Sequence, residues 1–422
     1  MGSLASQFSL TRGILGLFLV GLLALEGCEV VGTKPGSDST GQTTQPTAPT
    51  GSGSPSGPSY FSVTSDPSGS VSLSWGTVTG ASCYNVYRSV ASGVAGTLLA
   101  SPTTTYYSDT SAVTGTTYYY QVSAVTTSGE TAPTSQSAAE PGVTLSADTV
   151  WSGTVNLSHS VGIPSGRTLT INPGTTVAVT PGSRIEIYVS SGGTLKAQGT
   201  ATAPIVLKST SSAPGRSDWM GLGSWGGTLT LQYAAVEYAS YGFFAYSTPG
   251  GTYSVAHDVF AYCNVGICNY GGGVSPSSVA FIGDYWGFWS YASANLSQCV
   301  FQGSPGEAVM SSRSNTALTV SSSNFSGNSS DLQIFDTSAI VNNTIAATGN
   351  YPVTLSTLIS GTTDPNSTIL VTGGVTAPVA SAGAGFSYTV TPVAASVSRS
   401  LAATATETAT EADLRNFQRA QH

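Results

Sequence analysis

Acidic and basic side chains, which could carry out proton-transfer chemistry, are thinly scattered through residues 165–336. The basic ones are Arg167, Arg184, Lys196, Lys208, Arg216 and Arg313, and the acidic ones include Glu186, Asp218, Glu237, Asp258, Asp284, Glu307, Asp331 and Asp336. Two carboxylates about 5–9.5 Å apart can hydrolyse a glycosidic bond. A base beside carboxylates can remove a proton next to a sugar carboxylate. Catalysis therefore requires that the fold bring some of these scattered residues together.

The sequence offers little local support for such a site. Arg216 and Asp218 form the best local pair, and we expect a salt bridge within a turn there. His257 is a lone imidazole, expected at a solvated or core-edge position. No spacing resembles a zinc site, and we expect no cofactor or metal. The net charge of −8 argues against a nucleic-acid partner, because such proteins carry a basic stripe.

Aromatic residues recur at a fixed distance from glycines. The segments "YGFFAY" (241–246), "VGICNY" (265–270) and "WGFWSY" (286–291) each place a tyrosine four residues after a glycine. The aligned glycines are Gly242, Gly266, Gly287 and Gly306, at steps of 24, 21 and 19 residues. A period of about 20–25 residues with short β-type runs is typical of a solenoid with one coil per repeat.

Alternation along each strand predicts which of these side chains face the core. A narrow interior accepts Phe243, Ile267 and Phe288, but it offers no partners for the polar atoms of neighbouring Trp and Tyr side chains. The predicted outward aromatic patch therefore consists of Phe244, Tyr246, Tyr270, Trp289 and Tyr291. Three roles remain open: binding of sugar rings or a partner, coverage by another part of the chain, and a purely structural ladder.

Residues 58–138 contain short alternating runs separated by turn signals, among them "VSLSW" (71–75), "CYNVYRS" (83–89) and a long run from Thr117. They resemble a fibronectin type III domain. The resemblance implies that Trp75 packs in the core with Tyr84 or Val86, and that Tyr118 forms a tyrosine corner. Such modules are usually spacers or binding modules.

The segments "SGRTLTINPGTTVAV" (165–179), "SGGTLKAQGTATAPIVLKS" (191–209) and "RSDWMGLG" (216–223) resemble the first coils of right-handed parallel β-helices of bacterial surface proteins. Pectate lyases and polygalacturonases share this pectin-lyase-like fold, but the chain lacks the Asp-Asp, Gly-His-Gly and Arg-x-Lys stretches of a polygalacturonase. We expect a non-catalytic protein for glycan binding, adhesion or envelope structure. The alternatives are a lyase or hydrolase acting on acidic polysaccharide, and a rigid display scaffold.

The N-terminus predicts export. Arg12 precedes an apolar run at 13–25 that suits a signal peptide, and "LEGC" (25–28) resembles a lipobox. We expect removal of residues 1–27, lipidation of Cys28 and anchoring at the outer membrane or cell surface, or otherwise secretion. Residues 28–57 are predicted to be a flexible linker.

The predicted class is all-β. The expected parts after the linker are a sandwich at 58–138, a β-helix at 141–355, a C-terminal cap at 356–396 and a tail at 397–422. Cys263 and Cys268 lie five residues apart, so both a disulfide and two buried free thiols remain open. Asn324 and Asn343 form either a short ladder or two unrelated turns.

Overall fold

The computed structural model of the chain describes residues 56–182, 184–246, 250–271, 273–312, 316–335, 343–352, 354–360, 367–380 and 382–388. Every regular element in these ranges is a β-strand, which confirms the predicted all-β class. The predicted signal peptide, Cys28, the linker up to residue 55 and the tail at 397–422 lie outside the described residues. None of the described residues forms a helix suited to crossing a membrane.

The first domain is a fibronectin type III-like sandwich. One sheet contains β1 (Phe61–Ser65), β2 (Val71–Trp75) and β5 (Tyr106–Asp109), and the other contains β4 (Thr97–Ala100), β3 (Ala81–Ser89), β6 (Tyr118–Thr126), β7 (Gly129–Glu130) and β8 (Ser137–Ala139). Trp75 and Tyr84 meet edge to face in the core, with ring centroids 5.5 Å apart. The hydroxyl of Tyr118 accepts a hydrogen bond from the Val113 amide at 3.3 Å, which is the expected tyrosine corner.

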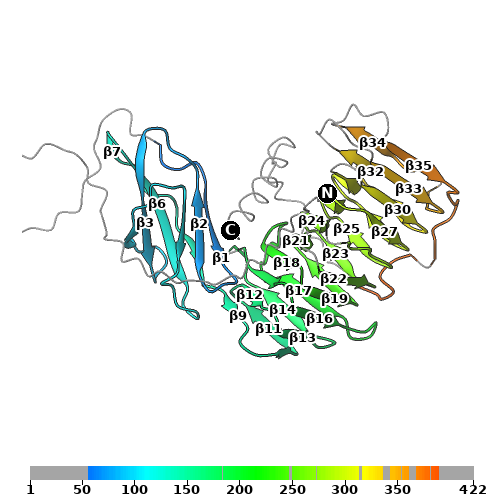
Figure 1. Cartoon of the computed structure of the whole chain (residues 1–422), viewed down its shortest axis with the longest axis horizontal. Coiled ribbons are helices and arrows are strands. Elements are labelled where there is room, and N and C mark those ends of the chain that lie inside the picture. Colours follow the sequence, from blue (N-terminus) through cyan, green and yellow to red (C-terminus); the bar gives the residue numbers. More distant parts are fainter. Residues whose placement is uncertain are drawn as a thin grey trace, which may run out of the picture.

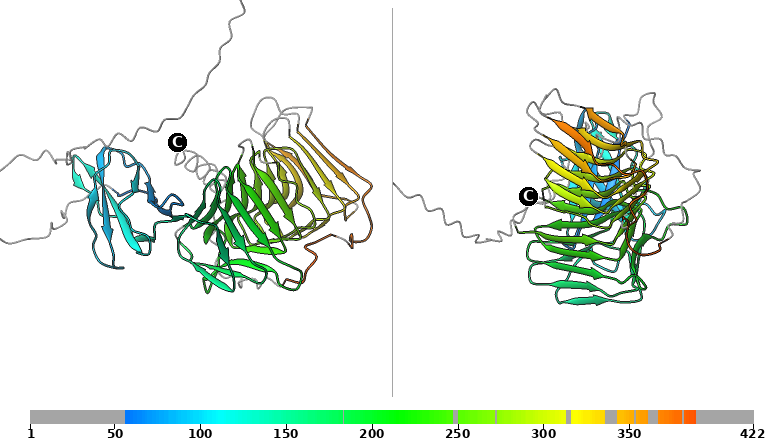
Figure 2. Two further views of the ribbon diagram at one scale, coloured as in Figure 1. Left: turned by 60° about the horizontal axis from the view of Figure 1, so that its bottom comes forward. Right: turned by 90° about the vertical axis from the view of Figure 1, so that its right-hand side faces the viewer.

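The second domain is a parallel β-helix whose coils visit three sheets in turn (Figure 1). Sheet 1 contains β10 (Thr149–Trp151), β13 (Thr168–Ile171), β16 (Thr194–Gln198), β19 (Thr228–Gln232), β22 (Thr252–Ala256), β27 (Ala294–Ser297), β30 (Ala317–Ser321), β33 (Thr344–Thr348) and β35 (Thr368–Thr372). Sheet 2 contains β11 (Thr154–Leu157), β14 (Thr176–Val179), β17 (Ile205–Ser209), β20 (Ala234–Glu237), β23 (Val259–Ala261), β25 (Ala280–Ile282), β28 (Val300–Gln302) and β31 (Asn324–Ser326). Sheet 3 contains β9 (Val143–Thr144), β12 (Val161–Ile163), β15 (Glu186–Val189), β18 (Trp219–Trp225), β21 (Ala239–Tyr246), β24 (Val265–Asn269), β26 (Trp286–Ser290), β29 (Glu307–Ser311), β32 (Ser330–Phe335) and β34 (Thr357–Ser360). Figure 2 shows the coils stacked as successive rungs.

The pairing register confirms three of the four aligned glycines. Phe243 pairs with Ile267, and Ile267 with Phe288, so Gly242, Gly266 and Gly287 occupy equivalent positions. The fourth alignment is wrong, because Phe288 pairs with Val309 and the equivalent of Gly287 is therefore Ala308. Gly306 instead lies just before β29, where its amide donates to the Tyr285 carbonyl at 3.0 Å.

The sandwich covers the first coil of the β-helix. The Ser160 amide donates to the Ser65 hydroxyl at 2.8 Å, and the Ser160 hydroxyl donates to the Ser65 carbonyl at 2.6 Å. The Thr144 hydroxyl donates to the Pro67 carbonyl at 2.9 Å. These bonds satisfy polar groups at an end that a solenoid must protect.

The C-terminal region differs from the predicted cap. Parallel pairing continues beyond residue 355, because β34 pairs with β32 and β35 pairs with β33. The chain then turns back over the outer face of sheet 2 as an extended segment, described at 375–380 and 382–388, which we call the strap. Its Val379 amide donates to the Asn324 side chain at 2.8 Å, and its Gly383 amide donates to the Gln298 carbonyl at 2.8 Å.

Small side chains on sheet 2 explain this path. Ala384 of the strap is buried against Ala235, Val259 and Ala280, which project from successive strands of that sheet. An apolar stripe on an outer sheet face is costly in water, and the strap removes it from solvent. At the end of the predicted cap, residues 386–388 form no strand, and residues 389–396 lie outside the described residues.

Candidate functional site

The structure brings the predicted aromatic patch together on the outer face of sheet 3. One hydrophobic cluster there contains Phe244, Tyr246, Tyr270, Trp289 and Tyr291. The side chains predicted to face inward, Phe243, Ile267 and Phe288, are fully buried in the inner core. Alternation along the strands therefore assigned both faces correctly, while the binding role of the patch stays a prediction.

A row of four half-buried rings, which we call the aromatic column, runs along the solenoid at one edge of this cluster. It consists of Trp225, Tyr246, Tyr270 and Tyr291, which lie at the C-terminal ends of β18, β21, β24 and β26 or one residue beyond them. Successive ring centroids lie 3.7, 5.3 and 4.7 Å apart. The first two pairs are stacked, with interplanar angles of 13° and 26°, and the third pair is tilted by 51°.

The predicted patch does not include Trp225, although the sequence contains a spacing that points to it. The segment "GLGSW" places Trp225 four residues after Gly221, which is the spacing of the three tyrosine segments. This segment ends in tryptophan where the other three end in tyrosine, so the tyrosine pattern does not include it. In the structure Trp225 pairs directly with Tyr246.

The centre of the patch is closed, which corrects the expectation that Phe244 and Trp289 face solvent. Phe244 is 6% exposed and Trp289 is 7% exposed. The Trp289 indole nitrogen donates to the Ser312 hydroxyl at 2.9 Å, so its polar atom is satisfied within the protein. Neighbouring outward side chains, including Trp286 and Met310, pack around these two rings and exclude water.

Stacking limits which surfaces of the column a ligand can touch. The broad faces of Tyr246 and Tyr270 lie against neighbouring rings, so these two residues offer mainly their outer edges. Beyond the ends, the register places Ser190 next to Trp225 and Ser312 next to Tyr291. Because Ser190 is small, Trp225 can offer a face as well as an edge.

Two of the acids that could have been catalytic are structural. Asp258 and Asp284 are fully buried at corners between sheets, where their Oδ1 atoms accept the Ala234 amide at 2.8 Å and the Cys263 amide at 2.7 Å. Burial raises the pKa of both carboxyls well above its ordinary value. Asn350 plays the same part in a later coil, where its Oδ1 accepts the Ser323 amide at 2.8 Å.

Of the two alternatives left open for Asn324 and Asn343, the structure shows two unrelated turns and no ladder. Asn324 holds the strap, because its side-chain nitrogen donates to the Val379 carbonyl at 3.1 Å. Asn343 instead accepts the Thr316 amide at 2.8 Å. The two residues therefore serve different corners of the solenoid.

The expected salt bridge between Arg216 and Asp218 is wrong. Asp218 accepts the Ser209 hydroxyl at 2.6 Å, and the Arg216 guanidinium donates to the carbonyl of Gly283. His257 lies at the edge of the core, as expected, and stacks on Tyr233 with ring centroids 4.9 Å apart.

Cys263 and Cys268 do not form the disulfide that the sequence left open. Both are buried free thiols, as is Cys299. Cys263 belongs to the inner core, whereas Cys268 belongs to the outer cluster on sheet 3. The sheet therefore separates the two sulfur atoms, which the spacing in sequence could not reveal. Within the described ranges no three His, Cys, Asp or Glu side chains are grouped to hold a metal ion.

Comparisons with known proteins agree with both parts of the fold. Residues 139–252 match the family model described as "Pectate-lyase like beta helix domain". No curated protein sequence matches the chain. A fibronectin type III-like protein from Clostridium thermocellum is 41% identical over 20% of this chain and 92% of its own, at a TM-score of 0.20.

Solved β-helical enzymes are more distant. A pectate lyase from Pectobacterium carotovorum is 13% identical over 74% of this chain and 89% of its own, at a TM-score of 0.19. A family 28 exopolygalacturonase from Yersinia enterocolitica is 10% identical over 75% of this chain and 87% of its own, at a TM-score of 0.26. Likenesses this weak carry no information about activity.

Proposed function

We propose that this protein is a non-catalytic polysaccharide-binding protein of the cell surface, in which a linear glycan lies along the aromatic column. The observation that supports this is the column itself. Four rings from consecutive coils stand in line, and each keeps part of its surface in solvent. A contiguous apolar row of this kind is unusual on a soluble surface and typically marks a binding site.

The physical chemistry of the column suits a sugar polymer. Coils repeat at about 4.8 Å, so a chain parallel to the solenoid axis meets one ring at each step. The C–H groups of sugar rings contact aromatic carbon, while the indole N–H and the phenol hydroxyls provide polar tips. Trp225 contributes most in this proposal, because it has a ring face to offer and the inner rings have mainly edges.

Three of the candidate acids lie away from the aromatic column, whereas Glu186 and Glu307 belong to strands of sheet 3. Asp258 and Asp284 are enclosed at the corners of the solenoid, and Glu237 accepts the Tyr388 hydroxyl beneath the strap. None of these three carboxyls lies on the outer face of sheet 3, where the column is. A lyase or hydrolase acting on a glycan held by the column would therefore need groups other than these.

The remaining parts of the chain suit a protein that is displayed at the cell surface. In this proposal Cys28 carries the lipid, residues 29–57 form the tether, and the sandwich acts as a spacer. Attachment by several acyl chains gives stable anchoring, whereas a single chain gives marginal anchoring. The bonds between Ser65 and Ser160 then fix the β-helix to the spacer.

A glycan array followed by affinity measurements tests this function. We expect the variant with Trp225→Ala and Tyr291→Ala to bind its best polysaccharide at least about tenfold more weakly, or about 1.4 kcal/mol. Tyr106→Ala is the matched control, because Tyr106 is 65% exposed on the sandwich and far from sheet 3 in sequence and fold. Equal binding by the double variant and the wild type would refute the role of the column. Release of unsaturated oligosaccharides would establish a lyase instead.

A further inference from the structure

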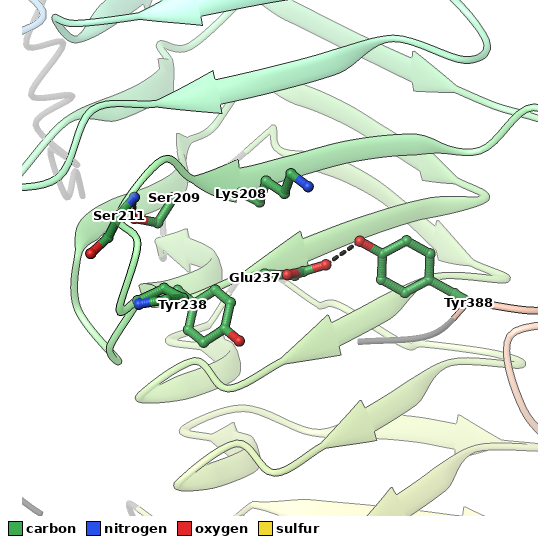
Figure 3. Close-up of a pocket in the computed structure, with 7 residues that line it drawn as sticks. Lys208, Ser209, Ser211, Glu237, Tyr238 and Tyr388 are labelled. Carbon is green, nitrogen blue, oxygen red and sulfur yellow. Dashed lines mark hydrogen bonds between the residues drawn. The ribbon is translucent and has the colours of Figure 1, made fainter. Parts of the chain in front are cut away.

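A polar recess lies on sheet 2, where the strap ends (Figure 3). Its volume is about 200 Å³, and its lining residues are Lys208, Ser209, Ser211, Pro214, Glu237, Tyr238 and Tyr388. Lys208 and Glu237 come from the adjacent strands β17 and β20, while Tyr388 comes from the strap. The recess thus joins side chains that are about 180 residues apart in sequence.

The strap completes the recess. Figure 3 shows the Tyr388 ring beside Glu237, whose carboxylate accepts the Tyr388 hydroxyl. Phe386 of the strap also meets Tyr233 edge to face, with ring centroids 5.9 Å apart. The Gly383 amide donates a hydrogen bond to the Gln298 carbonyl. Without the docked strap one wall of the recess would be missing.

The lining favours an uncharged ligand that carries several hydroxyls. The Lys208 ammonium only donates hydrogen bonds and an ionised Glu237 only accepts them, whereas a hydroxyl does both. An anion would face the Glu237 carboxyl, and a cation would face Lys208. Tyr238 and Tyr388 supply aromatic surface for the C–H groups of a ring.

The volume sets the size of the ligand. Pockets for drug-sized molecules occupy about 300–1,000 Å³, so this recess suits something smaller, such as one sugar ring. We infer that the recess is a binding site for a single neutral sugar unit, assembled when the strap docks on sheet 2. This inference does not rest on the aromatic column, which lies on sheet 3.

Calorimetric titration of the full chain with methyl glucoside and methyl galactoside tests this site, with glucuronate as the anionic comparator. We expect saturable binding of a neutral glycoside with a Kd on the order of 1–10 mM, as for a small ligand held by a few hydrogen bonds. Lys208→Met should weaken binding at least about tenfold. Lys196→Met is the matched control, because Lys196 is an exposed lysine on sheet 1.

Two variants separate the site from the strap and from the column. Tyr388→Ala should abolish binding, whereas Tyr388→Phe, which keeps the ring, should retain weakened binding. The variant with Trp225→Ala and Tyr291→Ala should bind the glycoside normally even where it has lost polysaccharide. The inference is overturned by the absence of saturable binding of either neutral glycoside, by an unchanged Kd in Lys208→Met, or by tighter binding of glucuronate.

Discussion

The rings of Phe281 and Phe301 stack almost perfectly parallel in the core, with centroids 4.8 Å apart and planes 2° apart. Phe260 and Phe325 extend this stack by one coil on each side. Across the interior the stack faces the glycine row of sheet 3. A Cβ atom added to Gly266 would lie 2.7 Å from Cδ1 of Phe281 and 2.6 Å from the Gly287 carbonyl oxygen. The glycines therefore repeat because the phenylalanine stack and the next coil occupy that space.

Gly266→Ala should destabilise the β-helix by about 1–3 kcal/mol, because an overpacked core forces side chains and backbone to shift. Urea denaturation followed by circular dichroism measures the effect. Gly215→Ala is the matched control, since the nearest atom to an added Cβ there is Asp218 Oδ1 at 3.7 Å. Equal stability of the two variants would show that the core can absorb the methyl group, contrary to the packing argument.

Asp258→Asn should make the protein more stable at pH 8 and leave it nearly unchanged at pH 4. Burial raises the folded-state pKa of Asp258 above its unfolded value, so its contribution to stability is present at low pH and is lost as the pH rises through the folded-state pKa. Asparagine imitates the protonated acid at every pH and still accepts the Ala234 amide. The free energy of unfolding, measured across this pH range, should therefore depend less on pH in the variant.

Asp148→Asn controls for the loss of an acid that holds a backbone amide in solvent. Asp148 is exposed and accepts the Thr168 amide at 2.9 Å, but it lies outside the core. Its replacement by asparagine keeps an acceptor for that amide and changes no buried charge. If Asp258→Asn behaves like Asp148→Asn, the buried acid is ionised in the folded protein and the expected sign is wrong.

The sequence predicts which way a side chain points from its strand better than it predicts whether that side chain is exposed to solvent. Strand alternation sent Phe243 inward and Phe244 outward correctly, because it depends only on local geometry. Whether an outward ring stays in solvent depends on neighbours from other coils. Trp289 is covered by Met310 of the next coil as well as by Trp286 of its own strand, so strand alternation alone does not predict its burial.

The sequence also does not predict which residues form hydrogen bonds with each other across the coils. Arg216 and Asp218 are near neighbours, yet each bonds to a residue that the coil winding brings close, namely Gly283 and Ser209. The strap was missed for a related reason. Most of its residues are small, and the apolar stripe that holds it is spread over several strands of sheet 2, so no local pattern in the sequence predicts that it docks there.

Glu186→Gln should remove a loss of stability that the wild type shows at high pH. Glu186 lies near the junction of the two domains. Burial, with a further contribution from Asp66 of the sandwich, raises the pKa of Glu186 to about 8. The stability it contributes is complete below its unfolded-state pKa and is lost as the pH rises through about 8. Thermal unfolding between pH 6 and pH 9 should show this loss in the wild type and not in the variant.

Asp66→Asn provides an independent check on why the pKa of Glu186 is raised. Removing its charge should lower the pKa of Glu186 and move the onset of the loss to lower pH, because less repulsion then opposes ionisation. A pH profile identical in Glu186→Gln and the wild type would contradict the assignment.

Alkylation with iodoacetamide should find Cys263, Cys268 and Cys299 reduced but protected. Burial raises the pKa of all three thiols, and only the thiolate reacts, so folded protein should show little modification at these positions. After denaturation without reductant, all three should be modified and detected by peptide mass spectrometry. If Cys263 and Cys268 resist alkylation until reductant is added, they form the disulfide that their placement on opposite sides of sheet 3 excludes.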